Sequence, residues 1–226
     1  MFIIGLLREV GWPMGFILVG VFMLALCVAI IPHEVAHGFV ALKMGDPSAK
    51  LARRLNFNPA NHFDPFGFLS FLLIGFGWAK PVPVNPFNYK NFRRGNFWVS
   101  IAGIITNLII AFIASFFLFL ITHFVHKSNM AIDAAYWFFY LCTFLSLSLA
   151  VFNLLPIYPL DGFNMLISFT KPNNRYMQFM RQNSMYVFIG LILFLTLPIF
   201  PDIIGMARNS IVDLYMWFWR TVFFWA

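Results

Sequence analysis

The chain alternates long apolar stretches with short polar segments. Four stretches contain no Asp, Glu, Lys or Arg over 20 or more positions: residues 10–32, 95–126, 134–160 and 182–201. About 20 apolar residues in a helix cross the roughly 30 Å hydrocarbon core of a bilayer. A helix also satisfies its own backbone hydrogen bonds in lipid. The pattern therefore predicts an all-α polytopic membrane protein with about four transmembrane helices.

Three further segments are predicted to depart from a simple span. Residues 65–79 are apolar, but they contain three glycines and are too short to cross comfortably, so we expect a re-entrant or interfacial segment. Residues 81–86, with the sequence PVPVNP, cannot form a helix and predict an extended segment. Residues 211–226 carry Asp213 and Arg220 on one helical stripe, which predicts an interfacial helix or a short tilted span.

Composition agrees with a membrane protein. Hydrophobic residues make up 61% of the chain and charged residues 10%, which excludes an ordinary soluble domain. We expect one domain over residues 1–226. The net charge of +7 comes from basic residues between the apolar stretches, so it does not indicate a nucleic-acid partner. Cys27 and Cys142 lie in apolar stretches and are expected to be free thiols.

The end of the first apolar stretch carries an H-E-x-x-H motif, from His33 through Glu34 to His37. Residues four apart share one face of a helix, so both imidazoles can bind a single metal ion with Glu34 beside them. Ionisable groups at membrane depth are costly and are usually functional. The alternative interpretation is a set of polar residues at a helix end that bind no metal.

A catalytic zinc site needs a third protein ligand and an open position. Glu9 is the only other glutamate, and span counting places it on the opposite side of the membrane. Asp161 is the best remaining candidate, because it is the sole acid at the inner end of the third span. A helix cap or a turn at Asp161-Gly162 is the alternative interpretation.

Loop charges predict the orientation of these groups. Eleven Lys and Arg residues lie on one side, in residues 43–54, 80–94 and 171–181, and three lie on the other, namely Arg8, Lys127 and Arg208. The positive-inside rule places the first group in the cytoplasm. We therefore expect a multi-pass protein of the cell membrane, with His33, His37 and Asp161 near its cytoplasmic face.

The two motifs together carry a family resemblance. The H-E-x-x-H motif and the later sequence NLLPIYPLDG, residues 153–162, resemble the site-2 protease family of intramembrane zinc metalloproteases. Residues 45–47, 77–86 and 103–107 are similar to its short bacterial branch, which lacks additional soluble domains. Tyr158 departs from the family pattern, which has proline there, and Ile104 stands where proline is common.

The resemblance implies roles for single residues. His33, His37 and Asp161 would bind one Zn²⁺ per chain. Glu34 would be the catalytic general base. Asn107 and Asn153 would hold the substrate or stabilise the reacting carbonyl.

We therefore expect a zinc endopeptidase that cleaves transmembrane or membrane-proximal segments of membrane proteins near the cytoplasmic face, using a metal-activated water. The expected partners are a transmembrane protein substrate and the lipid bilayer, and the pattern selects no oligomeric state. An alternative is a catalytically silent relative that binds membrane helices as an adaptor or chaperone. A di-iron site is disfavoured by the small number of histidines, and a transporter by the presence of a single ionisable cluster.

Overall fold

A computed structural model describes residues 12–67, 79–127, 129–171, 174–196 and 199–224. The helices are α2 (Trp12–Met44), α3 (Ser48–Leu51), α4 (Pro59–His62), the 3-10 helix η1 (Pro86–Asn88), α6 (Phe92–Phe124), α7 (Met130–Asn153), α8 (Asp161–Ile167), α9 (Arg175–Gln182), α10 (Ser184–Thr196) and α11 (Ile199–Phe224). Within these ranges the only extended pairing is an isolated antiparallel bridge between Phe63 and Ala79. The predicted all-α fold is confirmed.

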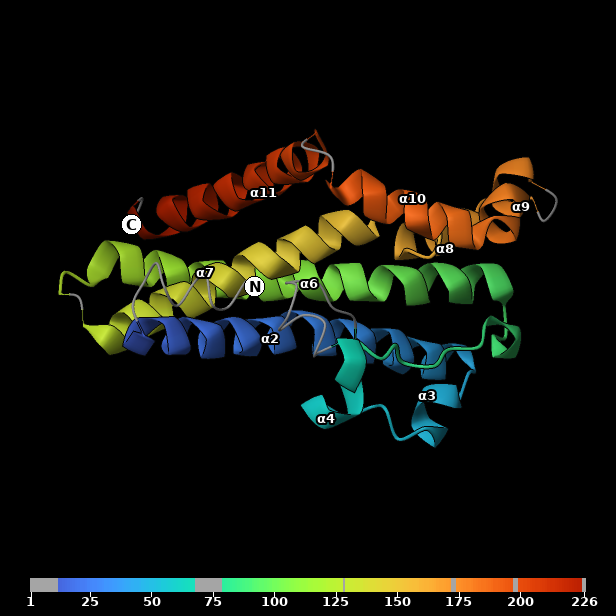
Figure 1. Ribbon diagram of the computed structural model, residues 1–226, viewed down its shortest axis with the longest axis horizontal. Helices are drawn as coiled ribbons and strands as arrows, with labels where there is room; N and C mark the ends of the chain where they lie inside the picture. Colours follow the sequence, from blue (N-terminus) through green and yellow to red (C-terminus); the bar gives the residue numbers. More distant parts are fainter. Residues whose placement is uncertain (1–11, 68–78, 128, 172–173, 197–198, 225–226) are drawn as a thin grey trace.

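Three helices are long and apolar enough to cross a membrane: Gly15–Met44 within α2, Phe92–Phe124 and Met130–Asn153. They lie side by side in Figure 1, with α2 and α6 running along each other and α7 crossing both. The first span continues 12 residues beyond its predicted end at Pro32, which lies inside the unbroken α2. The third ends at Asn153, earlier than predicted, because Pro156 and Pro159 follow and proline cannot continue a helix.

Small residues allow the three spans to approach closely. Ala25 of α2, Ala114 of α6 and Cys142 of α7 form one buried cluster. Side chains of this size bring helix backbones near each other in lipid, where packing rather than the hydrophobic effect drives association. Cys27 and Cys142 are both free, as the sequence predicts.

The structure differs from the prediction over residues 182–201. There, the described residues form α10 over Ser184–Thr196, 13 residues, and the description resumes with α11 at Ile199. Asn183 ends the preceding α9, and Pro198 and Pro201 stand beyond the end of α10 in the sequence. Among the described residues this stretch is not one of the three candidate spans, so a fourth span here stays a prediction.

The last helix, α11, begins at Ile199, well before the predicted segment 211–226. It packs against α6 and α7, and Figure 1 shows it running alongside them. The Tyr215 hydroxyl donates to the Leu108 carbonyl at 3.3 Å, and the Trp219 indole donates to Ser115 Oγ at 3.0 Å. These partners lie in the middle of α6, but α11 is not among the described helices that are apolar enough to be candidate spans.

Two predicted segments lie between α2 and α6. The extended character predicted for residues 81–86 is confirmed as far as Asn85, and η1 begins at Pro86. The re-entrant segment predicted for residues 65–79 falls mostly on residues 68–78, which lie outside the described residues. At its two ends, the Lys80 N–H donates to the His62 carbonyl at 2.8 Å.

Candidate metal centre

His33 and His37 lie one turn apart on α2, as the motif spacing predicts. Their rings meet edge to face, with centroids 4.6 Å apart. Asp161 is the first residue of α8, far from both histidines in the sequence, and its carboxylate lies beside their rings. Its Oδ2 lies 3.3 Å from His33 Nε2 and 3.2 Å from His37 Nε2, and the two Nε2 atoms are 3.0 Å apart. The structure therefore brings the three predicted ligands together.

The spacing of these three atoms suits one zinc ion. Zinc–nitrogen and zinc–oxygen bonds of about 2.0–2.1 Å in a tetrahedron place neighbouring ligand atoms roughly 3.3 Å apart. The observed separations of 3.0 to 3.3 Å match that edge length. Asp161 Oδ2 is buried and has no hydrogen-bond donor in the described structure, so a cation would supply the missing partner. Two imidazoles and one carboxylate also form the ligand set of a zinc site that keeps its fourth position open.

Surrounding groups orient the ligands. His37 Nδ1 lies 2.7 Å from the Val99 carbonyl of α6. A carbonyl only accepts, so this contact assigns the proton to Nδ1 and leaves Nε2 available as a metal ligand. Burial of the Asp161 carboxyl raises its pKa, but the neighbouring imidazoles of His33 and His37 outweigh burial and lower that pKa to about 2. The carboxylate is thus ionised, as a ligand must be.

Gly103 of α6 faces the two imidazoles. A Cβ at this position would lie 2.5 Å from His33 Cε1 and 2.6 Å from His37 Nε2. The missing side chain therefore lets α6 close over the centre. Gly162 has a similar role beside Asp161, because a Cβ there would overlap the Leu154 and Leu155 carbonyls.

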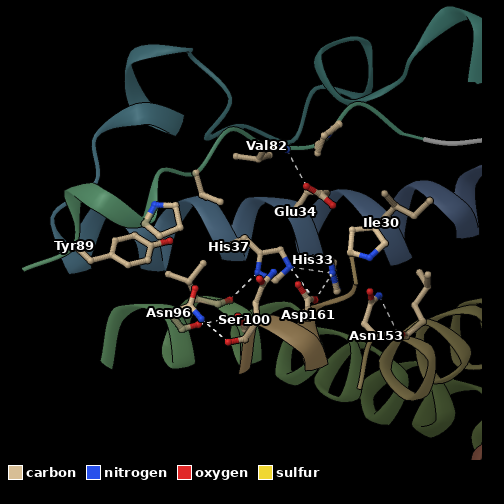
Figure 2. A pocket seen from close by; sticks show the side chains of 17 residues that line it. Ile30, His33, Glu34, His37, Val82, Tyr89, Asn96, Ser100, Asn153 and Asp161 are labelled. Carbon is tan, nitrogen blue, oxygen red and sulfur yellow. Dashed lines mark hydrogen bonds and ion pairs between the residues drawn. The ribbon is translucent and has the colours of Figure 1, made fainter. Parts of the chain in front are cut away.

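Glu34 projects beside the ligands toward the extended segment. Its Oε2 accepts a 2.9 Å hydrogen bond from the Val82 N–H, as Figure 2 shows. Glu34, the three ligands and Val82 line one cavity of about 390 Å³. Such a volume lies within the usual size range of ligand pockets. The carboxylate thus stands between the ligands and the extended segment.

The two predicted asparagines occupy different positions. Asn153, at the end of α7, lines the cavity and donates to the Leu149 carbonyl at 3.0 Å. Asn107 is fully buried one turn beyond Gly103, does not line the cavity, and has neither amide atom paired within the described structure. Asn96 does line the cavity, although sequence reasoning missed it. Its amide donates to the Asn164 carbonyl and, at 3.3 Å, to Ser168 Oγ, which ties α6 to the helix that begins at Asp161.

Sequence reasoning also missed the role of Asp46, which follows α2. Its buried carboxylate accepts hydrogen bonds from the Asn85 N–H at 2.6 Å, from Asn88 Nδ2 at 2.8 Å, and from the N–H and hydroxyl of Ser48 at 3.1 and 2.5 Å. Burial raises its pKa, but these four bonds outweigh burial and lower it. Asp46 therefore fastens the extended segment to the end of the helix that carries both histidines. The only sequence signal was an acid in a Gly-Asp-Pro turn.

Comparisons with known proteins place the chain in context. The family model described as peptidase family M50 matches residues 121–197, which include Asn153 and Asp161. A protein of Bacillus subtilis (strain 168) named "Putative zinc metalloprotease YwhC" is 40% identical over 205 residues, which are 85% of this chain and 90% of that protein. No solved structure shows a significant match to the chain.

Proposed function

Since the chain belongs to peptidase family M50, the site-2 protease family, and is a zinc metalloprotease of the membrane, we propose that it hydrolyses peptide bonds within or beside transmembrane segments of other membrane proteins. One observation carries the proposal. Two imidazoles and a carboxylate from α2 and α8 form a triangle of tetrahedral edge length beside a cavity of about 390 Å³. The recognition of the family and of the enzyme class from the sequence is confirmed.

His33, His37 and Asp161 would hold one zinc ion per chain. When bound, zinc polarises the scissile carbonyl and lowers the pKa of a coordinated water toward about 7. The position of Gly103 supports this assignment, because it leaves both imidazoles uncrowded.

Glu34 would act as the general base. It takes a proton from the attacking water as the new carbon–oxygen bond forms, and it delivers a proton to the amide nitrogen as the carbon–nitrogen bond breaks. Its place in the cavity wall beside the ligands supports this role. The hydrogen bond from the Val82 N–H would hold the carboxylate on that side of the cavity.

The substrate would bind in extended form along residues 81–86. A helix hides its carbonyls in its own hydrogen bonds, so the segment to be cut must unwind where protein can satisfy the freed groups. Val84 lines the cavity and makes no hydrogen bond with the described residues, which leaves its backbone free to pair with an added strand. Asn153 would donate to the reacting carbonyl from the opposite wall. Asn107 would reach substrate only if the surrounding helices part.

The metal centre would face the cytoplasm. It lies toward the end of α2, which carries Lys43 in its last turn and is followed by Lys50, Arg53 and Arg54, and toward the start of α6 with Arg93 and Arg94. These belong to the basic group that the positive-inside rule assigns to the cytoplasm. Cleavage at this depth would release the cytoplasmic part of a substrate.

The decisive experiment compares the wild-type chain with Glu34→Gln. Both should carry about one zinc, whereas only the wild type should cleave. Proteomics of membranes from cells expressing either form should show helical anchors that accumulate with Glu34→Gln. Chelation should abolish cleavage by the wild type, and zinc should restore it. Full activity of Glu34→Gln would refute the general-base role, and identical membrane proteomes with zinc-loaded protein would favour a non-catalytic adaptor.

A further inference from the structure

A second cavity, of about 180 Å³, lies where the start of α6 meets the end of α8 and α9. Three cations line it: Arg93 at the beginning of α6, Lys171 after α8, and Arg181 at the end of α9. These positions are far apart in the sequence, and the fold alone brings them to one opening, which we term the cationic pocket. Figure 1 shows α9 at the same end of the molecule as the start of α6.

The cations of this pocket lack anionic partners. None of the three forms an ion pair or a side-chain hydrogen bond with a described residue, and no acidic side chain lines the pocket. Like charges around a small cavity repel each other, so a bound anion would lower the energy of the arrangement. The first residues of the 33-residue α6 also lie here, and the N-terminal end of a helix carries partial positive charge.

The walls of the cationic pocket are apolar. Phe92, Ile167 and Met177 line it beside the charges. Phe169 and Phe179 are exposed nearby in sequence, at 70% and 57%. Phe92 is also the first residue of a candidate membrane span, and the end of such a span would place the pocket near the lipid headgroups. Basic pockets between membrane helices at this level suit anionic headgroups, with acyl chains beside the apolar surface.

We propose that the cationic pocket binds the phosphodiester headgroup of an anionic glycerophospholipid. Its charges match the phosphate, while its apolar walls and depth match a lipid better than free phosphate. Binding would join the start of α6 to the segment after α8, near the contact that Asn96 makes with Asn164 and Ser168. Since α8 begins with Asp161, the lipid would brace the helix that presents the third metal ligand. Lipid binding at this pocket does not depend on peptide hydrolysis.

The test uses the full chain in uncharged detergent, titrated with phosphatidylglycerol or phosphatidylcholine and measured by native mass spectrometry. The wild type should retain phosphatidylglycerol at a concentration about tenfold lower than phosphatidylcholine. The variant Arg93→Gln/Lys171→Gln/Arg181→Gln should lose this preference. A control, Lys43→Gln/Lys50→Gln/Lys90→Gln, removes three exposed cations outside the pocket and should keep it.

Three results would overturn the proposal: equal retention of both lipids by the wild type, a preference that survives the triple pocket variant, or displacement of lipid by millimolar inorganic phosphate. The last would identify a free-phosphate site instead. The zinc content of each variant reports whether the chain has folded. If the triple variant fails this check, Lys171→Gln and Arg181→Gln are measured singly, and each should weaken the preference about twofold, its share of a tenfold ratio divided among three cations.

Discussion

Replacing Gly103 with alanine tests the geometry of the metal centre most directly. In a helix, alanine is favoured over glycine by about 1 kcal/mol, so the change would stabilise the chain at an open position. At position 103 the new Cβ would lie 2.5 Å from His33 Cε1 and 2.6 Å from His37 Nε2, whereas ordinary contact begins at 3.4 Å. Each ring would have to retreat by about 0.8–0.9 Å, roughly four times the 0.2 Å tolerance of a zinc–ligand bond.

Little in the surroundings can absorb this displacement. Both histidines stand on one continuous helix, and the Val99 carbonyl tethers His37. Helix α6 cannot easily withdraw, because Ala111 and Ala114 are buried along the same packed face. Loss of a group that merely orients a metal ligand costs 10- to 100-fold in affinity, so displacement of two ligands should cost at least about 100-fold.

The assay is zinc content measured by mass spectrometry after equilibration of each purified variant with a competing chelator. Gly20→Ala is the open control, because no atom lies within 4 Å of its added Cβ, and it should keep zinc. Gly38→Ala is the crowded control. The three atoms nearest its Cβ would be in the side chains of Ala49 and Leu55 at 2.8 Å and of Val82 at 2.9 Å, none of them a proposed metal ligand, so it should lower the melting temperature and still bind zinc. Wild-type zinc affinity in Gly103→Ala would refute the assigned close approach.

Two further predictions concern the extended segment. Asp46→Asn should lower the free energy of unfolding by roughly 2–4 kcal/mol at neutral pH, because a buried carboxylate that accepts four hydrogen bonds loses its charge and gains a misplaced donor. Since folding lowers the Asp46 pKa, its contribution is present above the ordinary value of 3.8 and is lost as the pH falls through the lower folded value. Denaturant titrations should therefore give free energies of unfolding for the wild type and Asp46→Asn that converge in acid. The exposed control Asp213→Asn should match the wild type at every pH. A difference between the wild type and Asp46→Asn that stays constant at all pH values would contradict this. Replacing residues 81–86 with a Gly/Ser run should reduce turnover while zinc stays bound, and unchanged cleavage would remove the proposed strand pairing.

Much of the site could be predicted because it depends on local periodicity. The four-residue spacing of His33 and His37 places both on one helix face whatever the helix packs against. The depth of Asp161 followed from span counting, although the third helix ends at Asn153 and a short loop leads to α8. The error was small because Asp161 still lies within 3.3 Å of both histidines.

The contacts that were missed all depend on how separate elements approach each other. Glycine in a helix is usually a packing residue, and no sequence pattern indicates that Gly103 faces the metal ligands. Asp46 binds residues about 40 positions away, so its role depends on where the extended segment folds back.

The metal centre is built from two parts of the fold: α2 with the extended segment, and α8. His33, Glu34 and His37 belong to α2, and Asp46 at its end fixes the extended segment that meets Glu34 through Val82. The two histidines, Glu34 and the extended segment therefore form one connected body. The third ligand comes from α8, which reaches that body through α6. Zinc would be the link that closes the two parts around the cavity, so metal binding and assembly of the site are coupled. On this view the start of α8, rather than the extended segment, is where loss of metal would first loosen the site.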